Sequence, residues 1–226
     1  MAASTKIVDL FGIPACGKST LAEYISKNNE TEYKIATIQD IVGEAKTNKI
    51  KFIRSISLKS LFAAFRVRMT APFDKKRRDI TLRGWLLLLD VLFNYSKKFS
   101  YHDVVLVDHG AIQSFVSLER GDNLHEKPKF ANACLHYIDI SPITTYVYCK
   151  IDALNSVERM HNRNRNIGRI DVIDDKAKQL LELENESQRF DFYAKMLTEK
   201  QKEFFELNMT EKTEHIAEQL LLKIKN

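Results

Sequence analysis

The chain has 226 residues, of which 44% are apolar, and a formal net charge of +5, which predicts one domain, residues 1–226, with a full hydrophobic core. Its longest apolar runs, residues 61–65 and 85–89, fall far short of the roughly 20 residues of a membrane-spanning helix, and no leader pattern is visible. Three cysteines without a CxxC pair argue against structural zinc and disulfides, so we expect a cytoplasmic protein.

The first predicted strand, residues 6–11, runs directly into a segment that matches GxxxxGK[ST] at every required position. Its residues are Gly12, Ile13, Pro14, Ala15, Cys16, Gly17, Lys18, Ser19 and Thr20. Glycines at both ends let backbone N–H groups turn toward phosphate oxygens at the start of the following helix. Lys18 is then expected at the β- and γ-phosphates, Ser19 at Mg²⁺ and Thr20 at the α-phosphate. The segment therefore predicts binding of a nucleoside triphosphate with Mg²⁺.

Four further short β-rich runs predict strands over residues 33–38, 104–107, 145–149 and 203–207, with helical patterns between them. This alternation predicts a three-layer α/β fold: a five-stranded parallel sheet with helices on both faces. Residues 45–100 are expected to form a helical, basic insertion between the second and third strands. Because ligands bind at the carboxyl ends of parallel strands, the phosphate-binding segment lies where a site is expected.

Carboxylates follow the second and third predicted strands. Asp108 closes the apolar run 104–107, where it can hold Mg²⁺ or accept the proton of an attacking hydroxyl; the alternative is a cap on the next turn. Asp40 follows the second strand and is equally a candidate acceptor ligand, a base or a helix cap. Both carboxylates are therefore candidates for the phosphoryl-transfer site.

An arginine-rich segment, residues 158–169, follows the fourth predicted strand. Arg159 and Arg163 are four residues apart and share one helix face. Because guanidinium groups bind phosphate bidentately, residues 153–171 are expected to form a lid over the γ-phosphate, with Arg165 and Arg169 as further lid residues. A solvated basic helix is the alternative interpretation.

Together these motifs resemble the nucleoside and nucleotide kinases of the P-loop class, especially the thymidylate-kinase-like members. The resemblance implies ATP and Mg²⁺ at Lys18 and Ser19, and Asp108 at the metal or the acceptor hydroxyl. It also implies Arg159, Arg163 and Arg169 as lid arginines and Asn208, after the last strand, near the adenine. The chain departs from true thymidylate kinases in having Asp108-His109 in place of their Asp-Arg pair, and Gln39-Asp40 in place of an acidic-arginine-proline element. The identity of the acceptor therefore stays open.

Residues 46–83 contain twelve Lys or Arg and two acidic residues, a net charge of +10. Three interpretations remain: a cover over an anionic acceptor, a membrane-surface contact through residues 50–68, or a helix packed on the sheet with solvated lysines. Candidate acceptor contacts in this segment are Arg54, Arg66, Arg77, Arg78 and Arg83. No recognised nucleic-acid-reading motif accompanies the charge.

The sequence thus predicts an ATP-dependent kinase whose small acceptor is a nucleotide, nucleoside, sugar or sugar phosphate. The alternative is a regulatory or assembly NTPase whose basic segment binds membrane, nucleic acid or a protein. The chain lacks the NKxD and LSGGQ-like elements of common NTPase classes, which disfavours that alternative. The oligomeric state is left open.

Overall fold

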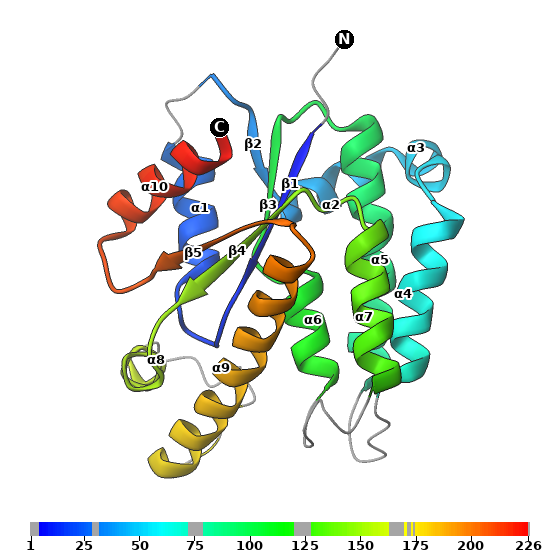
Figure 1. Ribbon diagram of the computed structural model, residues 1–226. Helices are drawn as coiled ribbons and strands as arrows, with labels where there is room; N and C mark the ends of the chain where they lie inside the picture. Colours follow the sequence, from blue (N-terminus) through cyan, green and yellow to red (C-terminus); the bar gives the residue numbers. More distant parts are fainter. Residues whose placement is uncertain are drawn as a thin grey trace. The chain divides into compact units, whose positions relative to one another are not determined.

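The computed structural model describes residues 5–28, 32–71, 79–119, 128–162, 170, 173 and 175–225 (Figure 1). Its strands are β1 (Lys6–Phe11), β2 (Ile35–Thr37), β3 (Val104–Val107), β4 (Thr145–Lys150) and β5 (Glu203–Asn208). They form one sheet in the order β2-β3-β1-β4-β5, and β3 pairs in parallel with both β1 and β2. The predicted α/β fold with a five-stranded parallel sheet is confirmed.

The helices are α1 (Lys18–Asn28), α2 (Ile38–Thr47), α3 (Lys49–Arg54), α4 (Leu58–Thr70), α5 (Asp79–Phe99), α6 (Ala111–Leu118), α7 (Pro128–Ile140), α8 (Ala153–His161), α9 (Lys176–Glu199) and α10 (Thr213–Lys225). Between β2 and β3 the described elements are all helical, as predicted for the insertion. Among the described helices, none combines the length and the apolar character that crossing a bilayer requires.

The second strand begins two residues later and ends one residue earlier than predicted, and its end is earlier because α2 begins at Ile38. Thr37 is the N-cap of α2, and its side chain accepts a hydrogen bond from the backbone N–H of Asp40. The Asp40 carboxylate in turn accepts one from the backbone N–H of Thr37, which completes a capping box. This reciprocal pair stabilises helical backbone from Ile38 onward, where the apolar pattern alone predicted strand.

The chain divides into two compact units. One comprises Met1–Asp9 and Asn29–Thr145, and the other comprises Leu10–Asn28 and Tyr146–Asn226. The second unit holds the phosphate-binding segment with α1, α8, α9, α10, β4 and β5, whereas Asp40 and Asp108 belong to the first. The organisation of residues 1–226 as a single domain stays a prediction.

Helices α4, α5 and α7 lie side by side in the first unit (Figure 1). The buried face of α4 is formed by the small residues Ser60, Ala63, Ala64 and Val67, which allow its neighbours to approach closely. From α5, Leu86, Leu89, Leu92 and Phe93 are buried, whereas Leu88 is exposed. The described contacts of this helix are chiefly with α2, α3, α4 and α6.

Asp90 is a fully buried carboxyl group on α5. Ser60 Oγ donates a hydrogen bond to its Oδ2 at 2.9 Å, and the Tyr137 hydroxyl donates to its Oδ1 at 3.3 Å. Burial disfavours the charged form and raises the pKa of Asp90 to about 6, although both hydroxyl contacts act in the opposite direction. Between about pH 4 and pH 6, Asp90 is therefore mostly protonated in the folded chain and mostly ionised in the unfolded chain.

We expect Asp90→Asn to increase the free energy of unfolding at pH 8 by about 1–3 kcal/mol, because it removes a buried charge and keeps the shape. A raised pKa stabilises the fold below pH 4, and this contribution is lost as the pH rises through about 6. Urea unfolding at pH 5 and pH 8 tests this, and the gain at pH 5 should be about half of the gain at pH 8. A loss of stability at both pH values would show that the ionised carboxylate is the form that the fold needs.

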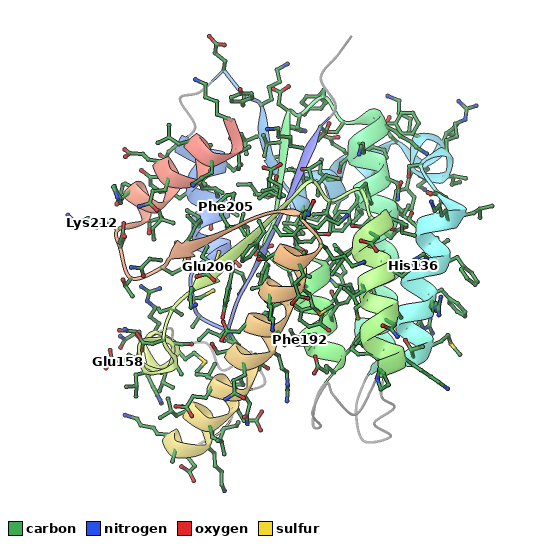
Figure 2. All side chains as sticks on the ribbon, viewed as in Figure 1. His136, Glu158, Phe192, Phe205, Glu206 and Lys212 are labelled. Carbon is green, nitrogen blue, oxygen red and sulfur yellow. The ribbon has the colours of Figure 1, made fainter. Side chains whose placement is uncertain are left out.

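The second unit packs α1 against α10, and α9 and α10 against β5. Phe11 of β1 stacks on Tyr148 of β4 at 5.2 Å between ring centroids, so aromatic rings fill the space below the phosphate-binding segment. On β5, Phe205 and Glu206 point to opposite faces (Figure 2), and Lys223 Nζ of α10 lies 6.0 Å from the Phe205 ring. This packing holds the strand ends that carry the site.

Candidate functional site

The segment after β1 has the backbone of a phosphate-binding loop. Gly12, Ala15 and Gly17 have φ angles of 152°, 60° and 106°, in the region that favours glycine. A Cβ atom on Gly12 would collide with the backbone oxygen of Cys149 in β4, so only glycine fits there. Ala15 holds a left-handed conformation without being glycine, and such outliers concentrate at functional sites.

Lys18 is the first residue of α1 and folds back over the loop. Its Nζ donates to the carbonyl oxygens of Gly12 and Ile13 at 2.8 and 3.2 Å, and lies 3.3 Å from Cys16 Sγ. Ser19 and Thr20 follow in the first turn and are exposed. The predicted phosphate and Mg²⁺ ligands thus stand together at the N-terminus of an 11-residue helix, where backbone N–H groups and the helix dipole favour an anion.

Helix α8 supports the phosphate-binding loop from the side. Asp152 caps this helix, and the hydrogen bond from the Asn155 backbone N–H lowers the pKa of the Asp152 carboxyl. The buried Ser156 hydroxyl donates to the carbonyl oxygen of Pro14 at 2.5 Å. Arg159 donates to the carbonyl oxygens of Cys16 at 3.1 Å and Met209 at 2.8 Å. This part of the predicted lid is therefore bonded to the loop, and Arg163, Arg165 and Arg169 lie outside the described residues.

Arg159 also forms one wall of a pocket of about 220 Å³ in the second unit. The other lining residues come from the loop, from α1 and from the chain after β5: Ala15, Cys16, Gly17, Thr20, Leu21, Met209, Glu211, Thr213 and Ile216. Pockets that enclose a whole drug-sized ligand measure about 300–1,000 Å³, so this one suits a smaller group such as one part of a nucleotide. It adjoins the loop predicted to bind phosphate.

Asn208 lies at the end of β5, immediately before the pocket residue Met209. Its Oδ1 accepts hydrogen bonds from the backbone N–H and the hydroxyl of Thr210 at 3.1 and 2.8 Å. The side chain therefore fixes the turn that presents Met209 and Glu211 to the pocket. The resemblance pointed to Asn208, but no sequence signal marked Met209 and Glu211 as lining residues.

In the first unit, Asp40 and Asp108 follow strands β2 and β3. Asp40 is exposed, and its Oδ2 accepts hydrogen bonds from the Thr37 backbone N–H and hydroxyl, both at 2.8 Å. Asp40 is thus not itself the N-cap of α2, which is Thr37, but the third helical residue of the capping box, and the carboxylate bonds of this box involve Oδ2. Asp108 is half-buried directly after β3.

A residue that the sequence analysis missed, Asp9, positions the loop after β3. Asp9 lies opposite Val107 in the sheet and is fully buried, and its carboxylate accepts from the backbone N–H groups of Ala111 and Ile112 at 2.9 and 3.2 Å. It therefore caps α6 and compensates its N-terminal dipole. A Cβ on Gly110 would collide with this carboxylate. The single acid within the apolar strand Lys6–Phe11 was the available sequence signal.

Trp85 of α5 provides a second support for the same loop, since its Nε1 donates to the carbonyl oxygen of His109 at 3.2 Å. Of the candidate acceptor contacts, Arg54 and Arg66 are exposed on α3 and α4, whereas Arg77, Arg78 and the side chain of Arg83 lie outside the described residues.

No protein-family model and no curated protein matches this chain. Solved structures of deoxyadenosine kinase from M. mycoides do match. The structure with the products dCMP and a flexible dCDP bound has a TM-score of 0.59 at 12% identity, covering 97% of this chain and 98% of that chain. Those with dCTP and dATP bound have TM-scores of 0.53 and 0.51, also at 12% identity, with 97% and 98% of this chain and 98% and 100% of those chains covered. The chain therefore has the fold of the P-loop nucleoside kinases, as the resemblance implied.

Proposed function

We propose that this protein is an ATP-dependent kinase that transfers the γ-phosphoryl group to a hydroxyl of a nucleoside. The observation that carries this proposal is the loop Gly12–Thr20, with Lys18 at its end and a pocket of about 220 Å³ beside it. Near-complete coverage by structures of deoxyadenosine kinase supports the nucleoside class among the acceptors that the sequence left open. The comparisons give the regulatory NTPase alternative no support.

The second unit binds ATP in this proposal. Backbone N–H groups of the loop and the Lys18 ammonium hold the phosphates, while the adjoining pocket takes the adenine base. Arg159 positions the two sides of that pocket, because it joins the loop at Cys16 to the turn at Met209. Arg163, Arg165 and Arg169 are proposed to stabilise the charge of the transferring group.

The hydroxyl of Ser19 and the carboxylate of Asp108 are the proposed Mg²⁺ ligands, since Mg²⁺ prefers oxygen donors and both groups supply them. When bound, Mg²⁺ neutralises charge that develops on the phosphate oxygens. Asp9 and Trp85 hold the loop that carries Asp108, so the Asp108 carboxylate is held in a fixed position for the metal. Asp40 is proposed to align the acceptor hydroxyl and accept its proton through Oδ1, while Oδ2 maintains the helix cap.

The test measures ATP consumption with Mg²⁺ against nucleosides, deoxynucleosides, nucleoside monophosphates, sugars and sugar phosphates, with products identified by mass spectrometry. We expect a nucleoside monophosphate formed in proportion to ADP. A product from sugars alone would overturn the acceptor class and leave the kinase activity in place. ATP binding without any phosphorylated acceptor would overturn the proposed activity itself.

We expect Arg159→Lys to raise the KM for ATP about tenfold, because Arg159 reaches the two carbonyl oxygens with two separate nitrogens, Nη1 and Nη2, and lysine has one nitrogen on a different stem. The change in kcat should be smaller, since Arg159 acts on the pocket through two backbone groups. ATP saturation curves at fixed acceptor concentration provide the measurement. The matched control is Glu158→Gln, an exposed residue of the same helix (Figure 2). An equal change in both variants would contradict this role for Arg159.

A further inference from the structure

Helix α4 has two apolar faces, of which only one is buried. Opposite the face that packs on α5 and α7, four large side chains follow at spacings of i, i+4, i+7 and i+11 and form one stripe along the helix. They are Leu58, Phe62, Phe65 and Met69, with exposed fractions of 80%, 67%, 43% and 63%. A continuous stripe of this kind marks an interaction surface, whereas single exposed apolar residues need no explanation.

Basic residues border the stripe on both sides. Lys59 and Arg66 lie along one side, and Arg68 lies along the other. From residue 48 to residue 71 the chain has six basic residues and no acidic one: Lys49, Lys51, Arg54, Lys59, Arg66 and Arg68. The surface is therefore apolar along its middle and cationic at its edges.

The apolar surface continues onto the neighbouring helix α3, where Ile50 and Ile53 are exposed, and through Ile56 in the connection. In Figure 1, α3 and α4 follow one another at the outer edge of the first unit. By contrast, α7 beside α4 exposes polar residues, among them Asn132. Another is His136, which Figure 2 labels. We call the exposed side of residues 49–69 the α3–α4 face.

We propose that the α3–α4 face docks on the surface of an anionic lipid bilayer. Its Phe, Leu, Ile and Met side chains enter the boundary between head groups and acyl chains, and its lysines and arginines meet the lipid phosphates. The helix lies in the plane of the surface and does not cross the bilayer. The proposal does not depend on the kinase function, because the phosphate-binding loop belongs to the other unit.

A second copy of the chain fits the stripe less well. An antiparallel pair of α4 helices would place Phe62 against the partner copy's stripe and match the apolar spacing. The same symmetry would bring Lys59 and Arg66 of both copies to one edge, with no acid on the helix to compensate. A bilayer with anionic lipids instead supplies a counter-charge to every basic residue of the face. The bilayer surface also covers α3, which a contact between two α4 helices would leave exposed.

The experiment is co-sedimentation of the full chain with vesicles of phosphatidylcholine alone and of phosphatidylcholine mixed with phosphatidylserine. One variant, Phe62→Gln with Met69→Gln, removes apolar stripe, and its control is Leu181→Gln with Leu222→Gln at similarly exposed positions elsewhere. A second variant, Lys51→Glu with Lys59→Glu, reverses charge on the face. Its control is Lys176→Glu with Lys195→Glu, two exposed lysines of α9. Thermal unfolding checks that each variant is folded.

We expect the wild type to bind the phosphatidylserine vesicles and to be released as ionic strength rises. Both face variants should bind the vesicles at least about tenfold more weakly than the wild type. Both controls should bind as the wild type does. Binding that is equal in all variants, or no binding by the wild type at low salt, would overturn the proposal. The proposal would also be overturned if the wild type were a dimer that does not bind vesicles, and if Phe62→Gln with Met69→Gln converted that dimer to a monomer. If the stripe variant fails to fold, the charge pair decides alone.

Discussion

Lys18→Met should lower kcat/KM for phosphoryl transfer by about 10²–10³-fold, since removal of one preorganised charge contact costs this much in comparable sites. Methionine keeps most of the length and apolar character of the stem and removes the ammonium group. In the structure this ammonium lies against the carbonyl oxygens of Gly12 and Ile13, within the loop that presents N–H groups for phosphate. No other described side chain of the segment Gly12–Thr20 carries a formal positive charge.

The matched control is Lys27→Met on the same helix. Lys27 is exposed and pairs with Glu23 at 2.6 Å, an interaction worth only a few tenths of a kcal/mol at a helix surface. Its loss should leave both catalysis and stability close to those of the wild type. Steady-state kinetics and ATP binding by calorimetry would be measured on both variants. Turnover by Lys18→Met at the wild-type rate would exclude the loop as the phosphate site.

The strands and the phosphate-binding loop could be predicted because short, local sequence patterns determine both. An apolar run of four to six residues identifies a buried strand, and the loop requires its glycines and lysine at fixed spacing. The start of α2 was misplaced because the capping box of Thr37 and Asp40 competes with a β-rich pattern. Here a local hydrogen-bond motif prevailed over residue propensity.

What the sequence could not provide are contacts between distant residues. Arg159 bonds to Cys16, 143 positions away, and to Met209, 50 positions away. Asp9 bonds to Ala111 at the start of α6, 102 positions away. Neither pairing has a periodicity or spacing that marks it in the chain. The outward stripe of α4 was ambiguous for a related reason. A helix with small residues on one side and large ones on the other does not reveal which side packs, and here close helix packing selected the small side.

Asp40→Asn should lower kcat by about 10²-fold or more, because a positioned proton acceptor contributes that much and an amide cannot take the proton. The amide oxygen of asparagine can still accept from Thr37, so the capping box and the start of α2 are expected to remain. Stability should therefore change little while catalysis falls. Single-turnover rates and urea unfolding would be compared with those of the wild type.

Thr37→Ala is the matched control because it removes the cap and retains the Asp40 carboxylate. Its expected cost is about 1 kcal/mol of stability, the usual value for the loss of an N-cap side chain, with a small effect on kcat. The two variants thus separate catalysis from helix capping at one turn. If Asp40→Asn retained nearly full activity, the carboxylate would be a cap alone. Asp108 would then be the remaining described carboxylate among the predicted site residues for the acceptor proton, and the same kinetic comparison on Asp108→Asn would follow.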